Sequence, residues 1–103
     1  MTKILLIGSS GQLGQELALT LPTLGTVVPV CRRELDLTLS ASISTLILDL
    51  KPDIIVNAAA YTAVDKAESE PDIAQQINAI APTIMAQSAE KIGAKFLQVS
   101  TDY

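Results

Sequence analysis

The chain has 103 residues, 49% of them hydrophobic and 17% charged, so it can bury the core of one small domain or of part of a larger one. A formal net charge of −4 at pH 7 without a basic cluster argues against nucleic acid as a partner. The sequence contains no apolar run of about 18 residues, so we expect neither a membrane span nor a leader. With no histidine and a single cysteine, Cys31, we expect no metal site, no internal disulfide and a cytoplasmic location.

The first predicted strand covers about Lys3–Ile7 and runs directly into a glycine-rich turn. Gly8, Gly11 and Gly14 follow at three-residue intervals, so that one can form the tight turn, one can admit a pyrophosphate and one can let a helix pack on the strand. No Gly-Lys-Ser/Thr follows, which argues against a Walker-type loop. An ordinary glycine-rich turn is the alternative to a dinucleotide phosphate site, whose predicted members are Gly8, Ser10, Gly11, Gln12, Leu13 and Gly14.

This turn opens a predicted helix over about Gln12–Leu24, in which leucines recur at three- and four-residue spacing and which Gly25 would end. The free N–H groups of the helix and the positive end of its dipole would point at a bound anion. The second predicted strand covers Thr26–Val30. Pro29 within it indicates an edge strand or a bend, because proline cannot donate a hydrogen bond to the ladder.

The residues after the second strand bear on the choice of cofactor. An NAD-type site places an acid about 20 residues past the glycines, where it binds the ribose hydroxyls. This chain has Cys31, Arg32 and Arg33 there, and two guanidinium groups can bind a 2′-phosphate that an acid would repel. We therefore expect NADPH, with NADH as the second option and two solvated loop arginines as the alternative. Asp36, with Leu37 beside it, could accept a bond from the adenine amino group or could mark the entry to a helix.

A second helix and a third strand follow. Ser40 or Ser42 is expected to cap the helix, which must end before Pro52 because the residue before a proline disfavours the helical conformation. Ile54–Asn57 is a short, continuous apolar run, typical of a strand that is buried on both faces of a parallel sheet. Small residues then let the backbone lie against the ribose and nicotinamide, unless they only serve tight packing; these candidate cofactor contacts are Ala58, Ala59, Ala60 and Tyr61.

A long third helix is predicted from about Ile73 to Ile92, with Gly93 at its end. Pro82 lies within this apolar pattern and should kink the helix, because the carbonyl of Asn78 loses its amide partner. The last predicted strand covers Lys95–Ser100.

Strands and helices thus alternate along the chain, an order that right-handed crossovers wind into a parallel sheet with helices on both faces. We predict an α/β fold, a Rossmann-like doubly wound parallel sheet, with residues 1–103 forming one NAD(P)-binding domain. The chain stops at Tyr103, just past the end of a central strand, so we expect this sheet to be incomplete.

Several segments give the chain a resemblance to a known family: GSSGQLG at residues 8–14, NAAAYTAVDKAE at 57–68, Asn78, and STDY at 100–103. Together they resemble the dTDP-4-dehydrorhamnose reductase family of the extended short-chain dehydrogenase/reductase group. The glycine motif is shared by the whole superfamily, whereas the second and last segments are more specific to this branch. The resemblance covers the whole chain and places Asn78 among the cofactor-binding residues.

This resemblance implies a role in reducing the 4-keto group of a dTDP-sugar, dTDP-4-dehydro-L-rhamnose, by NADPH or sometimes NADH. Thr101 matches the family's catalytic Ser/Thr, which would bond the substrate carbonyl, while a Tyr would donate the proton and a Lys would lower the pKa of that Tyr. No Tyr-x-x-x-Lys pair occurs among the 103 residues. We therefore expect the cofactor-binding half of a reductase, inactive by itself, with a homodimer left open.

Two other functions also stay open. The same fold branch includes a non-catalytic regulator of methionine adenosyltransferase, and the fold supports nucleotide-sugar epimerases and dehydratases as well. A Tyr-x-x-x-Lys pair downstream of Tyr103 would favour the reductase, and its loss would favour the regulator.

Overall fold

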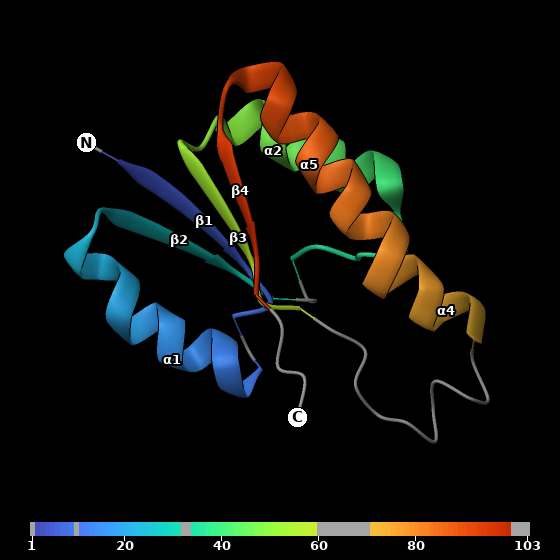
Figure 1. The fold of residues 1–103 in the computed structure, drawn as a ribbon, viewed down its shortest axis with the longest axis horizontal. Coiled ribbons are helices and arrows are strands. Elements are labelled where there is room, and N and C mark those ends of the chain that lie inside the picture. Colours follow the sequence, from blue (N-terminus) through green and yellow to red (C-terminus); the bar gives the residue numbers. More distant parts are fainter. Residues whose placement is uncertain (1, 10, 32–33, 60–70, 100–103) are drawn as a thin grey trace.

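The computed structural model describes residues 2–9, 11–31, 34–59 and 71–99. Four strands within these residues form one parallel sheet in the order β2-β1-β3-β4 (Figure 1). The strands are β1 (Lys3–Ile7), β2 (Thr26–Val30), β3 (Ile54–Asn57) and β4 (Lys95–Gln98). The bounds of the first three are those predicted from the sequence. β4 ends short of the predicted Ser100, because its last paired residue, Gln98, lies beside Asn57 at the end of β3.

The places of β2 and β3 in the sheet follow from their sequences. β2 lies at an edge of the described sheet, as Pro29 predicts, because an edge strand needs ladder donors on one side only. β3 lies between β1 and β4 and is buried from Ile55 to Asn57, as its continuous apolar run predicts.

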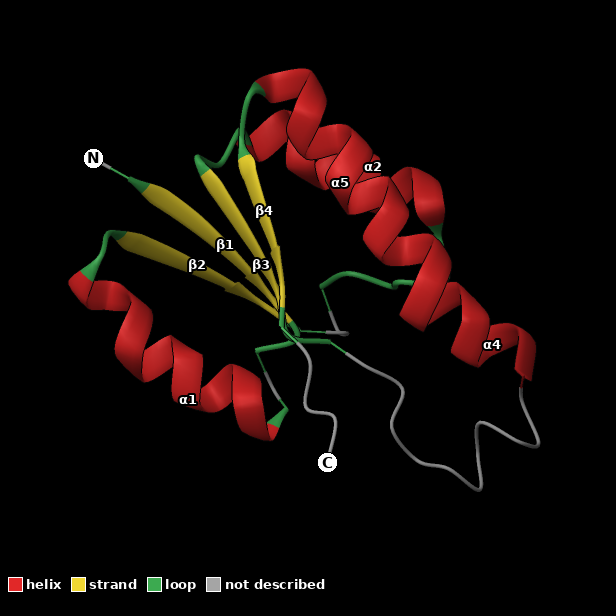
Figure 2. Ribbon diagram, viewed as in Figure 1, coloured by secondary structure: helices red, strands yellow, loops and turns green. Residues whose placement is uncertain are grey.

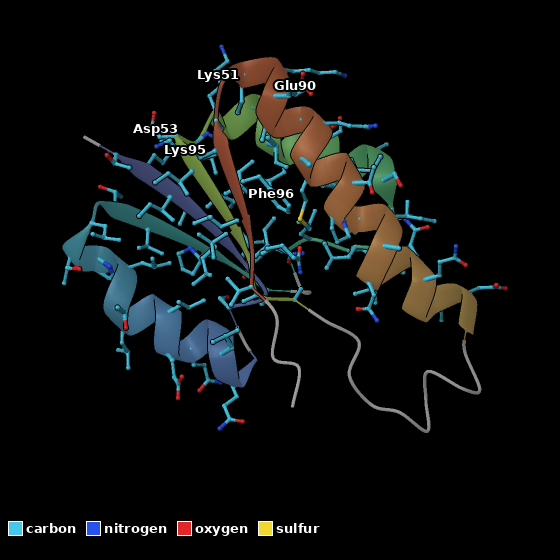
Figure 3. The ribbon with its side chains drawn as sticks, in the orientation of Figure 1. Lys51, Asp53, Glu90, Lys95 and Phe96 are labelled. Carbon is cyan, nitrogen blue, oxygen red and sulfur yellow. The ribbon has the colours of Figure 1, made fainter. Side chains whose placement is uncertain are left out.

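Helices cover both faces of the sheet. Figure 2 shows α1 (Gln12–Thr20) on one face and both α2 (Ser40–Leu50) and α5 (Ala81–Ile92) on the other. Side chains alternate along each strand, so odd and even positions enter different cores. The core beneath α2 and α5 contains Leu5, Ile7 and Ile55, with Phe96 packed against it beside α5 (Figure 3); the core beneath α1 contains Ile4, Leu6 and Val56. This arrangement confirms the predicted doubly wound α/β fold.

The first helix ends earlier than its leucine pattern predicts. α1 stops at Thr20, and a single 3₁₀ turn, η1 (Leu21–Thr23), replaces the last predicted residues. Pro22 explains the change, because it has no N–H to continue the α-helical bonding. Gly25 has a packing role instead of a capping one: a Cβ there would lie 2.4 Å from the carbonyl oxygen of Thr2.

The start of α2 also differs from the prediction. Leu39 occupies the N-cap position, without a side-chain hydrogen bond, so neither Ser40 nor Ser42 is the cap. The Ser40 hydroxyl instead accepts a hydrogen bond from Gln76 Nε2 at 3.2 Å, which ties the start of α2 to a helix much later in the chain. At its other end α2 stops at Leu50, before the proline, as predicted.

The long third helix is continuous but changes its hydrogen bonding. It consists of α4 (Pro71–Gln75), a π-helical turn η2 (Gln76–Ile80), and α5, which ends at Ile92 and has Gly93, with φ 71°, as its C-cap. The sequence predicts a kink at Pro82, and the structure places the wide turn immediately before it. Pro82 thereby falls in the first turn of α5, where a missing N–H is tolerated.

In the described part of the chain, no helix is both long and apolar enough to cross a membrane. Those same residues also contain no group of three or more His, Cys, Asp or Glu side chains that could hold a metal ion.

Candidate functional site

The predicted site residues that the structure describes lie mainly where the carboxyl ends of the strands meet the start of α1 (Figure 1). Hydrogen bonds join the segments that leave three strands. The amides of Gly8 and Ser9 both donate to the carbonyl of Val30, at 2.9 and 3.2 Å, and Ala58 N donates to the carbonyl of Ile7 at 2.8 Å. Segments far apart in the sequence therefore form one edge, which is where parallel α/β sheets bind ligands.

The backbone conformation and the packing of the described residues explain why residue 8 is a glycine. Its φ is +84°, a conformation that L-residues with a side chain rarely adopt. A Cβ at Gly8 would also lie 2.5 Å from Ala59 N and 2.7 Å from Ala59 Cα. Gly8 thus allows the turn after β1 to pack directly on the segment that leaves β3.

Gly14 is required for a second packing contact. It is buried in the first turns of α1, and a Cβ there would lie 2.0 Å from the carbonyl oxygen of Gly8. The absence of a side chain lets α1 approach the turn that precedes it. Helix packing therefore accounts for this glycine without a ligand.

Gly11 differs from the other two glycines. It is exposed, with φ −75° and ψ 169°, a conformation open to any residue. A Cβ at Gly11 would meet only the carbonyl oxygen of Gly8, at an ordinary 3.7 Å. The described residues leave room for a side chain here, so their packing does not explain the glycine. A group that approaches the backbone from outside would explain it.

The start of α1 offers backbone donors beside Gly11. Gly11 is the N-cap residue and supplies no side chain to the first turn. Gln12 is exposed and Leu13 half-buried at this end of the helix, whereas Ser10 lies outside the described residues. The first N–H groups of any α-helix lack intrahelical partners, and together with the helix dipole they favour an anion.

A tight turn follows β2. The amide of Cys31 donates to Glu34 Oε2 at 2.9 Å, and the thiol of Cys31 lies 3.4 Å from Glu34 Oε1. The amides of Glu34 and Leu35 return hydrogen bonds to the carbonyl of Cys31, at 3.0 and 3.1 Å. The predicted phosphate ligands Arg32 and Arg33 lie outside the described residues. Sequence reasoning missed Glu34, which brings a carboxylate back to the end of β2.

Asp36 stabilises the turn that leads into α2. Its Oδ1 accepts hydrogen bonds from the amide and the hydroxyl of Thr38, at 2.9 and 2.5 Å, and these bonds, the hydroxyl's foremost, lower the pKa of the Asp36 carboxyl below its usual value. This geometry fits the helix-entry interpretation, and the adenine contact stays a prediction. Leu37 is half-buried and packs against the core beneath α2 and α5.

Asn57 is a fully buried polar residue that sequence reasoning did not include in the site. Its Nδ2 donates to Gln98 Oε1 at 2.9 Å, its Oδ1 accepts from Ala59 N at 3.1 Å, and its carbonyl accepts from Val99 N at 3.0 Å. Asn57 therefore fixes the exit of β3 against β4 and holds Ala59 beside the glycine turn. The available signal was a polar residue that closes an apolar strand.

The remaining predicted residues divide into placed and unplaced ones. Ala58 and Ala59 are half-buried and pack against opposite cores, Ala58 on the α1 side and Ala59 on the α2 and α5 side. Asn78 lies exposed in η2. Ala60, Tyr61 and Thr101 lie outside the described residues, so their predicted contacts stay predictions.

Comparisons with known proteins agree on one family. The family model for the RmlD substrate binding domain matches residues 1–103. The dTDP-4-dehydrorhamnose reductase of Burkholderia thailandensis is 46% identical over 101 residues, which are 98% of this chain and 34% of that protein. The chain thus spans about a third of the length of the curated relatives it matches.

Solved structures give the same picture. A dTDP-4-dehydrorhamnose reductase from Clostridium acetobutylicum superposes with a TM-score of 0.91 at 41% identity, over 99% of this chain and 37% of that one. The Bacillus anthracis dTDP-4-dehydrorhamnose reductase in complex with NADP has a TM-score of 0.85 at 35% identity, over 93% of this chain and 35% of that one.

Proposed function

The chain belongs to the RmlD substrate binding domain family, and from this premise we propose that it forms the NADP(H)-binding part of a dTDP-4-dehydrorhamnose reductase. The observation that carries the proposal is the space that the described residues leave open at Gly11, beside the first N–H groups of α1. The NADP bound to the Bacillus anthracis relative supports the choice of cofactor class. The family's description names substrate binding, but the features described in this chain favour the cofactor.

The residues present fit a dinucleotide. The glycine turn and the start of α1 would hold the pyrophosphate, because they combine backbone donors with a position that no side chain fills. The residues after β2 and β3 would hold the two nucleoside ends. By segment, the proposed contacts are Gly8, Ser10, Gly11, Gln12, Leu13 and Gly14; Arg32, Arg33, Asp36 and Leu37; and Ala58, Ala59, Ala60, Tyr61 and Asn78.

The two arginines after β2 favour NADPH over NADH. If both guanidinium groups bind the 2′-phosphate, the preference should be about 1–3 kcal/mol. Titration of both cofactors by calorimetry measures it, with Arg32→Ala as the variant that should reduce it. A ratio of the two affinities that stays unchanged in Arg32→Ala would contradict this assignment.

In the proposed reaction, bound NADPH would supply a hydride to the 4-keto carbon of dTDP-4-dehydro-L-rhamnose. The Thr101 hydroxyl would donate a hydrogen bond to the keto oxygen and orient it, as the family resemblance implies. A donor already in place stabilises the negative charge that develops on this oxygen. The proton that completes the product hydroxyl would come from the Tyr of a Tyr-x-x-x-Lys pair, as the family resemblance implies, and these 103 residues contain no such pair.

Gly11→Val tests the cofactor site directly. The branched side chain should fill the space proposed for the pyrophosphate and weaken NADP(H) binding by roughly 100-fold or more, while valine at an N-cap costs only about 1 kcal/mol of stability. Ala86→Val, at an exposed position of α5, is the matched control and should bind normally. Calorimetry gives the affinities and thermal unfolding gives the stability. Unchanged affinity in Gly11→Val would mean that the glycine turn is merely structural.

A further inference from the structure

Glu34 follows Cys31 by three residues, but its side chain folds back and places a negative charge at the end of β2. Its two carboxylate oxygens face the amide and the thiol of Cys31, at 2.9 and 3.4 Å, and the turn is closed by the return bonds to the Cys31 carbonyl. Leu35, the next residue, is buried in the core beneath α2 and α5 and anchors the turn. The position of the carboxylate is therefore set by the fold.

This carboxylate shares a strand end with the glycine turn. Cys31 directly follows Val30, whose carbonyl accepts hydrogen bonds from both Gly8 and Ser9. A dinucleotide whose pyrophosphate lies at Gly11 would extend its adenosine ribose toward the end of β2. In NAD-type sites an acid at this point accepts hydrogen bonds from the ribose hydroxyls, and it repels a 2′-phosphate.

The Glu34 side chain can take this role without leaving Cys31. A carboxylate has about four lone-pair directions, and the described turn uses one of them on each oxygen. Glu34 is also exposed, so the described residues leave the remaining directions open to a ligand. The sequence places no acid at residue 31, and the fold brings one there.

We propose that Glu34 is a specificity-determining residue that binds the ribose hydroxyls of NADH and opposes the 2′-phosphate of NADPH. This inference rests on the proposed cofactor function. Glu34 thereby offsets the preference for NADPH that the two neighbouring arginines would give. The affinities of the chain for NADH and NADPH should therefore differ less than they would with the arginines alone.

The experiment compares the dissociation constants of NADH and NADPH, measured by calorimetry on the whole chain, in wild type and Glu34→Gln. The Gln amide oxygen can still accept from the Cys31 amide, so the turn should persist and circular dichroism should be unchanged. We expect NADH to bind about tenfold more weakly and NADPH no more weakly than in wild type. Glu16→Gln, at an exposed position on α1, removes the same charge elsewhere and should leave the ratio unchanged.

A second variant separates charge from turn geometry. Adding Cys31→Asp to Glu34→Gln returns a carboxylate to the end of β2 and should restore NADH binding. An unchanged ratio in Glu34→Gln, equal weakening of both cofactors, or failure of this rescue would overturn the proposal for Glu34 while leaving the cofactor site intact. Failure of the wild-type chain to bind either cofactor would overturn the proposed function itself.

Discussion

At the scale of single residues, the glycines of the turn are equally spaced in the sequence but have different roles. Gly8→Ala should destabilise the chain by about 2–4 kcal/mol, because it combines a positive φ with a Cβ that meets the backbone of Ala59. Gly11→Ala should cost less than about 1 kcal/mol, because its φ is ordinary and its neighbours leave room. Chemical denaturation measures both changes, and equal losses would contradict this division.

The Asp36 turn should show a defined response to acid. Because hydrogen bonds from Thr38 lower the pKa of Asp36, this group stabilises the fold above its unfolded pKa, near the usual 3.8, and the contribution is lost as the pH falls through the folded pKa. Thr38→Val removes the hydroxyl and should raise the pKa of Asp36 toward its usual value. An NMR pH titration of the Asp36 carboxyl carbon measures the shift. A pKa that stays unchanged in Thr38→Val would show that the hydroxyl is not its cause.

The sequence identified the glycine turn but could not identify every residue around it. The three glycines of this turn lie close together in the sequence, so a local motif is enough to predict the turn. Glu34 and Asn57 act through folded geometry: one carboxylate turns back to Cys31, and one buried amide reaches Gln98, forty-one residues away. The partner of Asn57 depends on which strand ends the fold brings together, so a polar residue at the end of an apolar strand signals a role but not the contact. The Glu34 contact spans only three residues, but it requires the turn that the hydrogen bonds to the Cys31 carbonyl close.

At the scale of secondary-structure elements, the end of α2 is strained. Lys51 has φ 51°, the only positive φ of a non-glycine residue in the described chain, and it lies at the sheet end opposite the glycine turn (Figure 3). Gly93 occupies the equivalent position after α5. Lys51→Gly should therefore stabilise the chain by about 0.5–1 kcal/mol, measured by denaturant unfolding. Lys51→Ala removes the charge without relieving the strain, so an equal gain there would contradict this explanation.

Element bounds were predictable where the apolar pattern and punctuation agree. β1, β2 and β3 are bounded runs of apolar residues, and their predicted limits are confirmed. The bounds of helices that contain a proline were less predictable, because the backbone can accommodate the missing N–H of proline in several ways. It ends α1 with a 3₁₀ turn at Pro22 and accommodates Pro82 with a π-helical turn.

At the scale of the whole molecule, the parallel topology gives the two ends of the sheet different chemistry. The carboxyl ends of the strands meet the positive end of α1, where the candidate site lies. At the opposite end Lys3 Nζ donates to the carbonyl of Leu50 at 2.9 Å, which satisfies the negative end of α2. Strand and helix alternation suffices to predict this polarity, because parallel strands share one direction.

The 103-residue chain by itself is expected not to reduce dTDP-4-dehydro-L-rhamnose, even in the presence of NADPH. The aliphatic hydroxyl of Thr101 can polarise a carbonyl but is too weak an acid to protonate the developing alkoxide, and no Tyr-x-x-x-Lys pair occurs in these residues. An NADPH-oxidation assay measures this, with the Burkholderia thailandensis reductase as the positive control. In a longer protein that carries both this chain and that pair, Thr101→Val should lower kcat by about 10²–10³. Turnover by the 103-residue chain, or an unimpaired Thr101→Val enzyme, would contradict the proposed division of roles.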